Sequence, residues 1–321
     1  MDGTLPVSAA LAALPDLTVR EDVPLSQYTR FGIGGPASLL ADTANETSFL
    51  AGLRIARESG MPFVVLGAGS NLVVSDAGYR GLVLRYTSNA MRHSGDVIEV
   101  DAGAVLQDLV NFSIRCGLAG LHTMTGIPGW VGAAVYGNAG AYGHSMHEFV
   151  REVRFTDGVA VRTFDNAACE FAYRESVFKR HKEWILLSAQ LRLAAGEEAA
   201  LQAKADEILA LRNAKYPPTM KCAGSIFKNL LYAQLPASAQ AAVPQNVVRE
   251  GKVPSAWFLE QAGVKGMRRG DIQVASYHAN LIYNDGSGTA RDLCAVISEL
   301  KHRVRDRFGF DLEEEVQYVG F

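Results

Sequence analysis

A long segment without ionised side chains constrains this chain more than any other feature. From Cys116 to His147, 32 residues pass without an Asp, Glu, Lys or Arg, and eight of them are glycines. A membrane-spanning helix needs ~20 apolar residues, but Pro128, Asn138 and this many glycines do not suit a helix that faces lipid. The segment is therefore expected to be buried against protein or a bound molecule.

Glycine is unevenly distributed along the whole chain. Nineteen of the 31 glycines lie between Gly32 and Gly143, and only Gly158 lies between residues 144 and 195. Glycine costs conformational entropy on folding, so such a cluster indicates backbone that approaches something closely or adopts positive φ. We interpret the cluster as the mark of one domain.

The remaining composition excludes several classes of protein. With 48% hydrophobic and 20% charged residues, the 321-residue chain is expected to form two or three soluble domains. A net charge of −3 gives no reason to expect nucleic-acid or membrane binding. The four cysteines form no CxxC pair, so we expect no metal site and a reducing, cytoplasmic location. A secretory signal is not expected either, because the first basic residue is Arg20.

The hydrophobic periodicity and the positions of capping and turn residues predict an α+β mixture rather than a regular βαβ alternation. The expected helices cover residues 7–14, 46–60 after a Thr43–Glu46 capping box, 105–116, 197–213, 255–261 and 289–309. The expected strands cover residues 63–66, 72–74, 82–84, 97–101, 184–193 and part of 313–320, with a hairpin of 150–155 and 159–164 around Asp157-Gly158.

The last of these helices has the strongest pattern. Thr289 and Asp292 can cap its start, one apolar stripe runs along it, and Gly309 can end it. The basic run Lys301–Arg307 is interrupted by stripe positions, so it is interpreted as the solvent-facing side of this helix and not as a nucleic-acid site.

The segment Leu66–Asn71, with sequence LGAGSN, follows a predicted strand. A dinucleotide fingerprint would place a third glycine where Leu72 stands, and a strand follows instead of a helix. Two interpretations remain open: a plain tight turn, or a nest of amides that holds a pyrophosphate.

The segment Ile127–Gly143 carries the richest glycine pattern. Pro128 suits the first turn of a helix, whose free amides would face an anion. Gly129 and Gly132 leave room on one side of that helix, and residues 138–143 offer consecutive donors without bulky side chains. A flat or extended ligand against this backbone would explain the missing charge, while a glycine-rich helix-packing seam is the alternative.

Few polar residues suggest chemistry by themselves. Ser225 follows Gly224, with Lys228 nearby, but no G-x-S-x-G surrounds it, so hydrolase chemistry has no support. His144 and His147 are a weak metal pair without a third ligand. The alternating pattern of residues 313–320 predicts that one of its first three carboxylates points inward, without deciding which.

Six motifs in one order carry a family resemblance: Thr29–Pro36, Gly67–Asn71, Gly126–Gly129 with Asn138–Gly143, Tyr173–Ser176, Gly224–Asn229 and Glu315-Val316. Together they resemble the UDP-N-acetylenolpyruvoylglucosamine reductase (MurB) family of bacterial cell-wall synthesis. The resemblance runs from about Leu17 to Phe321.

The resemblance implies a fold of vanillyl-alcohol-oxidase type (PCMH type): an FAD-binding domain in two subdomains, followed by a C-terminal α+β substrate domain. The implied boundaries are an N-terminal extension (1–20), the FAD domain (21–195) and the substrate domain (196–321). FAD would be bound without a covalent link, by Thr29, Arg30, Gly34, Gly35, Pro36, Gly67, Ala68, Gly69, Ser70, Asn71, Leu72, Gly126, Ile127, Pro128, Gly129, Gly132, Ala133, Asn138, Gly140, Ala141 and Tyr142.

The resemblance also implies a reaction. NADPH reduces FAD, and the enolpyruvyl ether of UDP-N-acetylglucosamine then accepts hydride and a proton to become UDP-N-acetylmuramate. Ser225 would donate the proton, while Arg174 and Glu315 would stabilise the developing charge. Substrate-side positions match Arg212, Lys215, Asn229 and Gln261.

The chain departs from the family pattern at several places. Gln317 stands where the family has an arginine, Ala133 replaces a frequent glycine, and the 51-residue interval from Arg174 to Ser225 is too short for the tyrosine-bearing loop of one subclass. Residues 230–254 resemble an insertion to which the sequence assigns no function. The oligomeric state and the choice between NADPH and NADH stay open, with a monomer as the working expectation.

Two other functions compete with this one. An FAD-dependent oxidase of the same fold would often tether its flavin to a histidine, for which His122 and His144 are the candidates. A non-catalytic protein that binds flavin or UDP-sugar would have no use for Arg174, Ser225 and Glu315.

Overall fold

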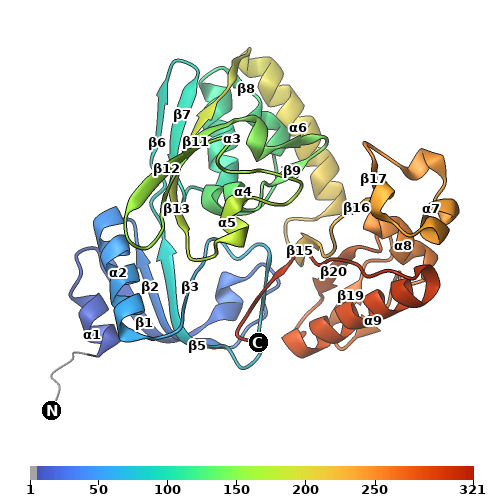
Figure 1. The fold of residues 1–321 in the computed structure, drawn as a ribbon, viewed down its shortest axis with the longest axis horizontal. Coiled ribbons are helices and arrows are strands. Elements are labelled where there is room, and N and C mark those ends of the chain that lie inside the picture. Colours follow the sequence, from blue (N-terminus) through green and yellow to red (C-terminus); the bar gives the residue numbers. More distant parts are fainter. Residues whose placement is uncertain (1–5) are drawn as a thin grey trace. The chain divides into compact units, whose positions relative to one another are not determined.

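The computed structural model describes residues 6–321, which form two compact units interleaved along the chain (Figure 1). Unit 1 comprises the described residues up to Val23, together with Ala37–Ala68 and Arg80–Pro217. Unit 2 comprises Pro24–Pro36, Gly69–Tyr79 and Pro218–Phe321.

Unit 1 contains the following elements: α1 (Val7–Ala12), β1 (Leu17–Pro24), β2 (Pro36–Thr43), α2 (Glu46–Ser59), β3 (Phe63–Val65), β5 (Tyr79–Tyr86), β6 (Met91–Ser94), β7 (Val97–Asp101), α3 (Leu106–Arg115), β8 (Leu118–Ala119), α4 (Val131–Tyr136), β9 (Gly140–Ala141), β10 (His144–Ser145), β11 (Val150–Thr156), β12 (Val161–Asp165), α5 (Val177–Arg180), β13 (Ile185–Arg192), β14 (Ala194–Ala195) and α6 (Glu198–Lys215). Short 3₁₀ turns lie at Leu121–Met124 and Met146–Glu148.

Unit 2 contains the 3₁₀ turn Leu25–Tyr28, β4 (Leu72–Val74), β15 (Lys221–Ser225), β16 (Leu230–Leu231), α7 (Ala237–Ala242), β17 (Lys252–Val253), α8 (Ser255–Gln261), β18 (Arg268–Arg269), β19 (Ile272–Val274), β20 (Leu281–Asn284), α9 (Ala290–Phe308) and β21 (Gln317–Val319), with further 3₁₀ turns at Tyr232–Gln234 and Gln245–Val247.

Two sheets organise unit 1. One has the order β1-β2-β5-β3, and its core includes Leu53 and Phe49 of α2. The other has the order β12-β11-β13-β7-β6, and its core includes Leu109 of α3 and Val135 of α4. The α+β mixture expected from the sequence is confirmed, and among the described residues no helix has the length and apolar run that a membrane span requires.

The start of α2 corrects one expectation from the sequence. The residue that caps this helix is Asn45, whose side chain accepts a hydrogen bond from the Ser48 amide, and not Thr43. The Thr43 hydroxyl instead accepts from the Asn45 amide at 3.0 Å, so it shapes the turn before the helix. The helix ends as expected at Gly60, which adopts φ +67°.

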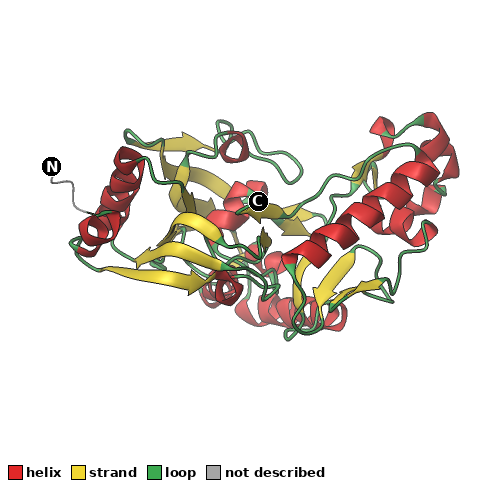
Figure 2. Ribbon diagram, turned by 90° about the horizontal axis from the view of Figure 1, so that it is seen from below, coloured by secondary structure: helices red, strands yellow, loops and turns green. Residues whose placement is uncertain are grey.

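Unit 2 is built around the sheet β15-β20-β19-β18, and α9 packs along it (Figure 2). Thr289 caps α9 through the Asp292 amide and Gly309 ends it, as the sequence predicts. Asp76, from a distant part of the chain, also accepts hydrogen bonds from the first two amides of α9, at 2.8 and 2.9 Å. The final strand β21 pairs in parallel with β4.

The insertion expected at residues 230–254 forms a closed excursion in unit 2. Its two ends pair as β16 and β17, and α7 lies between them. The Glu250-Gly251 turn inside it has both residues at positive φ, as a two-residue hairpin turn requires. The chain therefore enters and leaves the insertion at neighbouring positions.

Candidate active site

The loop between β3 and β4 presents unused backbone amides. The amides of Gly67, Ala68, Gly69 and Asn71 find no acceptor among residues 6–321. Gly69 adopts φ +64°, and a Cβ there would lie 1.8 Å from the Tyr28 carbonyl oxygen. Amides left open in a turn of this kind form an anion-binding nest, which favours the second of the two interpretations left open above.

The glycine-rich segment behaves differently from the expectation at Pro128. The helix α4 begins three residues later, at Val131, and its first two amides donate to the carbonyls of Ala104 and Ala102. Those two amides are therefore not available to a ligand. The backbone bends at Gly129, with φ +123°, before the helix starts.

Other amides of this segment do stay open. Within the described chain, the amides of Gly129, Trp130 and Ala133 have no protein acceptor. A Cβ on Gly67 would lie 3.7 Å from the Trp130 Cβ and 3.8 Å from the Ala133 Cβ, so the loop after β3 lies against the start of α4. Unit 1 thus gathers the open amides of Gly67 and Ala68 with those at the start of α4, and the Arg85 guanidinium lies over the Trp130 ring, 4.7 Å from its centroid.

A turn that carries Arg174 lies against the same glycine-rich segment. Arg174 Nη2 donates to the Gly140 carbonyl at 2.7 Å. Ala172 and Glu175 exchange both backbone hydrogen bonds, and Arg174 sits between them at φ +58°. A non-glycine residue at positive φ is strained, and such strain often accompanies functional sites.

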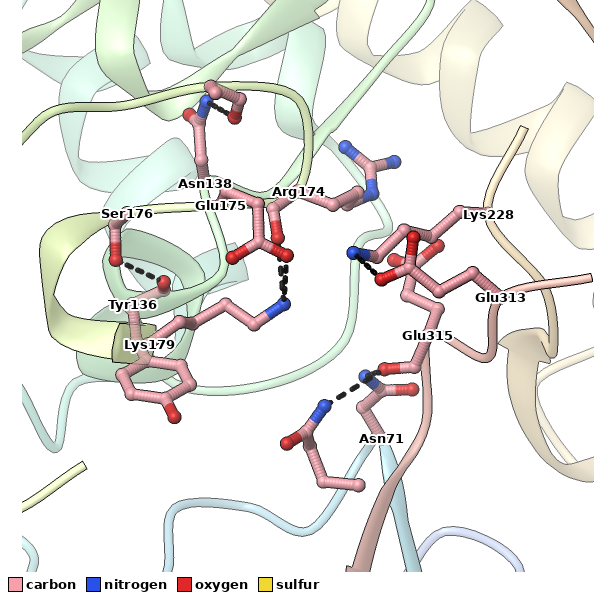
Figure 3. Close-up of polar contacts among 12 residues, drawn as sticks. Asn71, Tyr136, Asn138, Arg174, Glu175, Ser176, Lys179, Lys228, Glu313 and Glu315 are labelled. Atoms are coloured by element: carbon pink, nitrogen blue, oxygen red, sulfur yellow. Dashed lines mark hydrogen bonds and ion pairs between the residues drawn. The ribbon is translucent and has the colours of Figure 1, made fainter. Parts of the chain in front are cut away.

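Several side chains hold this turn in place (Figure 3). Lys179 Nζ donates to the Arg174 carbonyl at 2.8 Å and to Glu175 at 3.0 Å. The Ser176 hydroxyl donates to the Tyr136 carbonyl, and Asn138 Nδ2 donates to the Ala172 carbonyl. The sequence reasoning missed Lys179, although its spacing of four from Glu175 was a visible signal.

The end of α6 brings two predicted substrate cations to unit 1. Arg212 lies against Gly126, because a Cβ on that glycine would be 2.9 Å from Arg212 Cδ. The Gly126 amide donates to Gln107 Oε1 at 2.7 Å. Arg212 and Lys215 both lie over the ring of Tyr216, at 5.7 and 5.1 Å from its centroid. Arg212 and the glycine-rich segment are therefore brought together.

In unit 2, Ser225 ends β15 at an irregularity. The register between β15 and β20 shifts after Cys222, where Gly224 adopts φ +77°, and Ser225 pairs with Leu281. Such a bulge redirects a side chain locally. Within residues 6–321 the Ser225 hydroxyl makes no hydrogen bond.

Glu315 lies beside this strand end. Its amide donates to the Ile226 carbonyl at 2.7 Å, and its carbonyl accepts from Asn71 Nδ2 at 2.8 Å (Figure 3). Gln317 Nε2 also donates to the Glu315 carbonyl, at 3.3 Å. Within unit 2, the structure thus brings Ser225, Glu315 and Asn71 of the predicted site onto neighbouring backbone positions.

The three carboxylates of this segment have distinct surroundings. Glu313 is 70% exposed and pairs with Lys228, whose side chain is 10% exposed. Glu314 pairs with Lys301 of α9. The sequence reasoning noted Lys228 near Ser225 but did not place it in the site, and the burial of its side chain is a signal that only the structure supplies.

The remaining predicted residues of unit 2 have local partners. The Thr29 hydroxyl donates to the Ile33 carbonyl at 2.8 Å, and the Arg30 amide donates to the Gly69 carbonyl at 3.1 Å. Asn229 Oδ1 accepts from the Ser255 amide, and the Gln261 carbonyl accepts from Arg307.

Gly34 and Gly35 are required by close backbone approach. A Cβ on Gly34 would lie 2.8 Å from the Val74 Cβ, and one on Gly35 would lie 2.3 Å from the Asp76 carbonyl oxygen. The same two glycines line a pocket of about 440 Å³ together with Lys221.

The histidines do not form a metal site. His144 Nδ1 lies 2.8 Å from Glu148, and His147 Nδ1 lies 2.7 Å from the Ser145 hydroxyl. Burial lowers the pKa of His122, which favours its neutral form. Among the described residues no group of three or more His, Cys, Asp or Glu side chains could hold a metal.

The site residues fit FAD. Backbone amides can hold a pyrophosphate, and the open amides at Gly67, Ala68, Trp130 and Ala133 would be the donors. A dinucleotide with a flat ring also explains why an uncharged, glycine-rich backbone is exposed at this point of the fold.

Comparisons with known proteins agree with this geometry. Residues 37–160 match the family model for an FAD binding domain, and residues 216–319 match that for the C-terminal domain of UDP-N-acetylenolpyruvoylglucosamine reductase. The FAD-binding fold of vanillyl-alcohol-oxidase type expected above is thereby confirmed.

Whole-chain relatives carry the same name. The UDP-N-acetylenolpyruvoylglucosamine reductase of Solibacter usitatus is 63% identical over 97% of this chain and 99% of its own length. That of Syntrophus aciditrophicus is 36% identical over 93% and 91%. The crystal structure of the enzyme from Thermus caldophilus matches with a TM-score of 0.74 at 29% identity, covering 94% of this chain and 99% of that one. The chain belongs to the UDP-N-acetylenolpyruvoylglucosamine reductase family, and with it to the FAD-dependent oxidoreductases.

Proposed function

We propose that this chain reduces the enolpyruvyl ether of UDP-N-acetylglucosamine to UDP-N-acetylmuramate, a step of peptidoglycan precursor synthesis, at the expense of NADPH. Family membership over nearly the full length supports the assignment. The observation that carries the chemistry is the junction of Ser225 and Glu315, where the Glu315 amide donates to the Ile226 carbonyl at 2.7 Å.

The proposed cofactor residues belong to backbone loops. When bound, FAD would supply hydride transfer between NADPH and the terminal methylene carbon of the enolpyruvyl group. The amides of the 67–71 loop and of Trp130 and Ala133 would hold its pyrophosphate. The other FAD contacts proposed from the family pattern lie in residues 29–36 and 126–142.

Ser225 is proposed to deliver the proton that completes the reduction. Addition of hydride to the methylene carbon leaves charge on the neighbouring carbon and its carboxylate. A serine is a weak acid, so this charge provides the driving force, and the fixed strand end provides the geometry. The proton forms the new C–H bond, and solvent then reprotonates the serine.

Arg174 and Glu315 are proposed to stabilise the developing charge. A guanidinium binds a carboxylate in a bidentate way that a lysine cannot reproduce. The turn held by Lys179 fixes the direction of Arg174 before substrate arrives. Arg212, Lys215, Asn229 and Gln261 are proposed as substrate-side residues, where cations suit a diphosphate.

The organisation of the protein is part of the proposal. The proposed domain boundaries lie after residues 20 and 195. They separate an N-terminal extension (1–20), an FAD-binding domain (21–195) and a substrate-binding domain (196–321). A monomeric, cytoplasmic enzyme is proposed, as befits a reaction between two soluble nucleotides.

An anaerobic experiment tests the function. The purified flavoprotein is first reduced with NADPH, which bleaches the visible flavin band, and the enolpyruvyl sugar nucleotide is then added. We expect the band to return and one lactyl ether to form per flavin. A band that stays bleached after normal reduction by NADPH would show that the substrate is wrong.

Precipitation with acid separates the oxidase alternative. A colourless pellet and a yellow supernatant are expected from loosely bound FAD. Both histidines considered as tethers for a flavin already have protein partners. His144 contacts Glu148, and His122 Nδ1 accepts a hydrogen bond from the Gly120 amide. Neither the oxidase nor a non-catalytic binding protein gains support from the relatives.

A further inference from the structure

Glu314, the neighbour of Glu315, is held by two side chains that none of the roles above uses. Lys301 Nζ of α9 donates to Glu314 Oε1 at 2.7 Å, and the Tyr318 hydroxyl donates to Glu314 Oε2. The Glu314 side chain is 19% exposed and that of Lys301 is 31% exposed, whereas Tyr318 is 40% exposed, so the cluster is partly open to water. We name Lys301, Glu314 and Tyr318 the strand clamp.

The backbone links the strand clamp to Glu315. Glu314 pairs with Phe227 in an antiparallel bridge, and the Glu315 amide donates to the Ile226 carbonyl. Successive side chains of an extended chain point to opposite sides. The contacts of Glu314 hold its side chain on the side of α9. They therefore fix the backbone orientation at this point, which directs the Glu315 side chain to the opposite side.

Helix α9 anchors one side of the strand clamp, and a polar pocket lies beside it. The helix α9 is capped at both ends and buries a stripe of apolar residues from Leu293 to Phe308. A polar pocket of about 310 Å³, lined by Cys294, Ser298, Arg305 and all three clamp residues, lies alongside. Leu312 and Val316 anchor the segment by apolar burial, and on the side of this pocket the polar contacts of the strand clamp add to that packing.

The Tyr318 hydroxyl is suited to a permanent donor role. Burial, followed by the neighbouring Glu314 carboxylate, raises the pKa of Tyr318 above its ordinary value. Its proton therefore stays in place throughout the pH range in which an enzyme of this kind works.

We propose that Lys301, Glu314 and Tyr318 are positioning residues, which tie the segment carrying Glu315 to α9 and thereby hold Glu315 and the adjoining Ser225 strand end in reactive geometry. This inference rests on the proposed function. It assigns these residues no contact with substrate or cofactor.

The test compares two variants that each remove one cation from α9. Lys301→Met breaks the 2.7 Å pair with the strand, whereas Arg303→Met breaks the 2.7 Å pair with Glu299, which stays on the helix. Each variant is studied as the holoenzyme by anaerobic rapid mixing, and the two half-reactions are recorded separately. Thermal unfolding is measured in parallel.

We expect Lys301→Met to slow reoxidation of the flavin by the enolpyruvyl sugar nucleotide by on the order of tenfold or more, with flavin reduction by NADPH unchanged. Arg303→Met should leave both rates as in the wild type, and Lys301→Arg, which keeps a donor, should restore the second rate. Tyr318→Phe, which removes one hydroxyl, should act in the same direction as Lys301→Met and serves if that variant does not fold.

Two results would overturn the inference. One is an equal rate of the second half-reaction in Lys301→Met and Arg303→Met, and the other is an equal slowing of both half-reactions. Failure of the proposed function is distinguishable, because the wild-type enzyme itself would then not be reoxidised by the sugar nucleotide.

Discussion

At the scale of single residues, substitution of Ser225 tests the proposed mechanism most directly. Its hydroxyl lies at the end of β15 without a protein partner in the described chain, and the bulge at Gly224 sets its direction. A proton donor of this kind matters only after hydride has moved. The two half-reactions should therefore respond to its loss in different ways.

Ser225→Ala is expected to leave flavin reduction by NADPH at the wild-type rate. The second half-reaction should slow by on the order of 10²–10⁴-fold, the usual contribution of a general acid. Stopped-flow absorbance under anaerobic conditions measures both rates. Equal loss in both halves would instead mean that Ser225 has a structural role.

Gly69 allows a second comparison at this scale, because Gly60 has nearly the same backbone angle. Both residues adopt φ near +65°, yet a Cβ on Gly60 meets nothing within 4 Å, while one on Gly69 would lie 1.8 Å from the Tyr28 oxygen. Gly60→Ala should cost about 1 kcal/mol in the free energy of unfolding, from the angle alone.

Gly69→Ala should cost roughly twice that or more, because the Tyr28 backbone must also move. It should weaken FAD binding as well, since the open amides of the loop shift with it. Urea unfolding and flavin titration check the two expectations. Similar free energies of unfolding for the two variants would show that the loop shifts at little energetic cost.

At the scale of elements, helix ends were predictable where their signals are local. Thr289 and Gly309 bound α9, and Gly117 follows α3, as the sequence indicates, because caps and left-handed glycines depend only on neighbouring residues. The same reasoning was wrong at Thr43, where two candidate caps stand two residues apart and only the helix register decides between them.

Long-range pairing could not be predicted in this way. The parallel pairing of β21 with β4 joins residues about 245 positions apart, and no local pattern encodes it. The sequence predicted a helix that starts at Pro128 and has free amides in its first turn. The helix instead begins at Val131, whose amide donates to the Ala104 carbonyl beside the bridge between Val105 and Trp130, a pairing that no local pattern reveals. The motifs identified the site residues, but the contacts that orient Arg174 came from Lys179 and Asn138.

The turn of the β11–β12 hairpin gives a prediction in pH. The Asp157 carboxylate accepts from the amides of Ala160 and Val159 and pairs with Arg162, and these contacts hold its pKa well below the usual range. Because the folded-state pKa is depressed, the stabilisation is complete above the unfolded value of about 3.9 and is lost as the pH falls below it.

Asp157→Asn removes this pH-dependent part. The wild type should therefore melt at a higher temperature than the variant at pH 7, and the difference should shrink as the pH is lowered below about 4. Thermal melts at several pH values give the answer. A difference that stays constant down to pH 2 would mean that the Asp157 charge does not contribute.

At the scale of the whole molecule, unit 2 is assembled from three separate pieces of chain. Its sheet and α9 come from the C-terminal hundred residues, but β4 pairs with β21, and Asp76 caps α9. The Phe31 carbonyl also accepts a hydrogen bond from buried Asn284. The C-terminal segment alone therefore lacks several of its own partners.

A fragment of residues 218–321 is expected not to fold cooperatively by itself. It would expose the β21 edge and leave α9 without the Asp76 contacts, each a cost of about 1 kcal/mol or more in a domain of marginal stability. Circular dichroism with thermal melting tests this, with the intact chain as the control. A sharp melting transition of the fragment would contradict the expectation.

The pairing of β4 with β21 has a consequence for how the protein is made. A ribosome adds roughly 5–20 residues per second, so β4 emerges well before the strand that completes it, by about 10–50 s at that pace. During this interval its edge and the neighbouring amide loop have no native cover. A chain that stops before Gln317 would lack β21 and so would never close this edge.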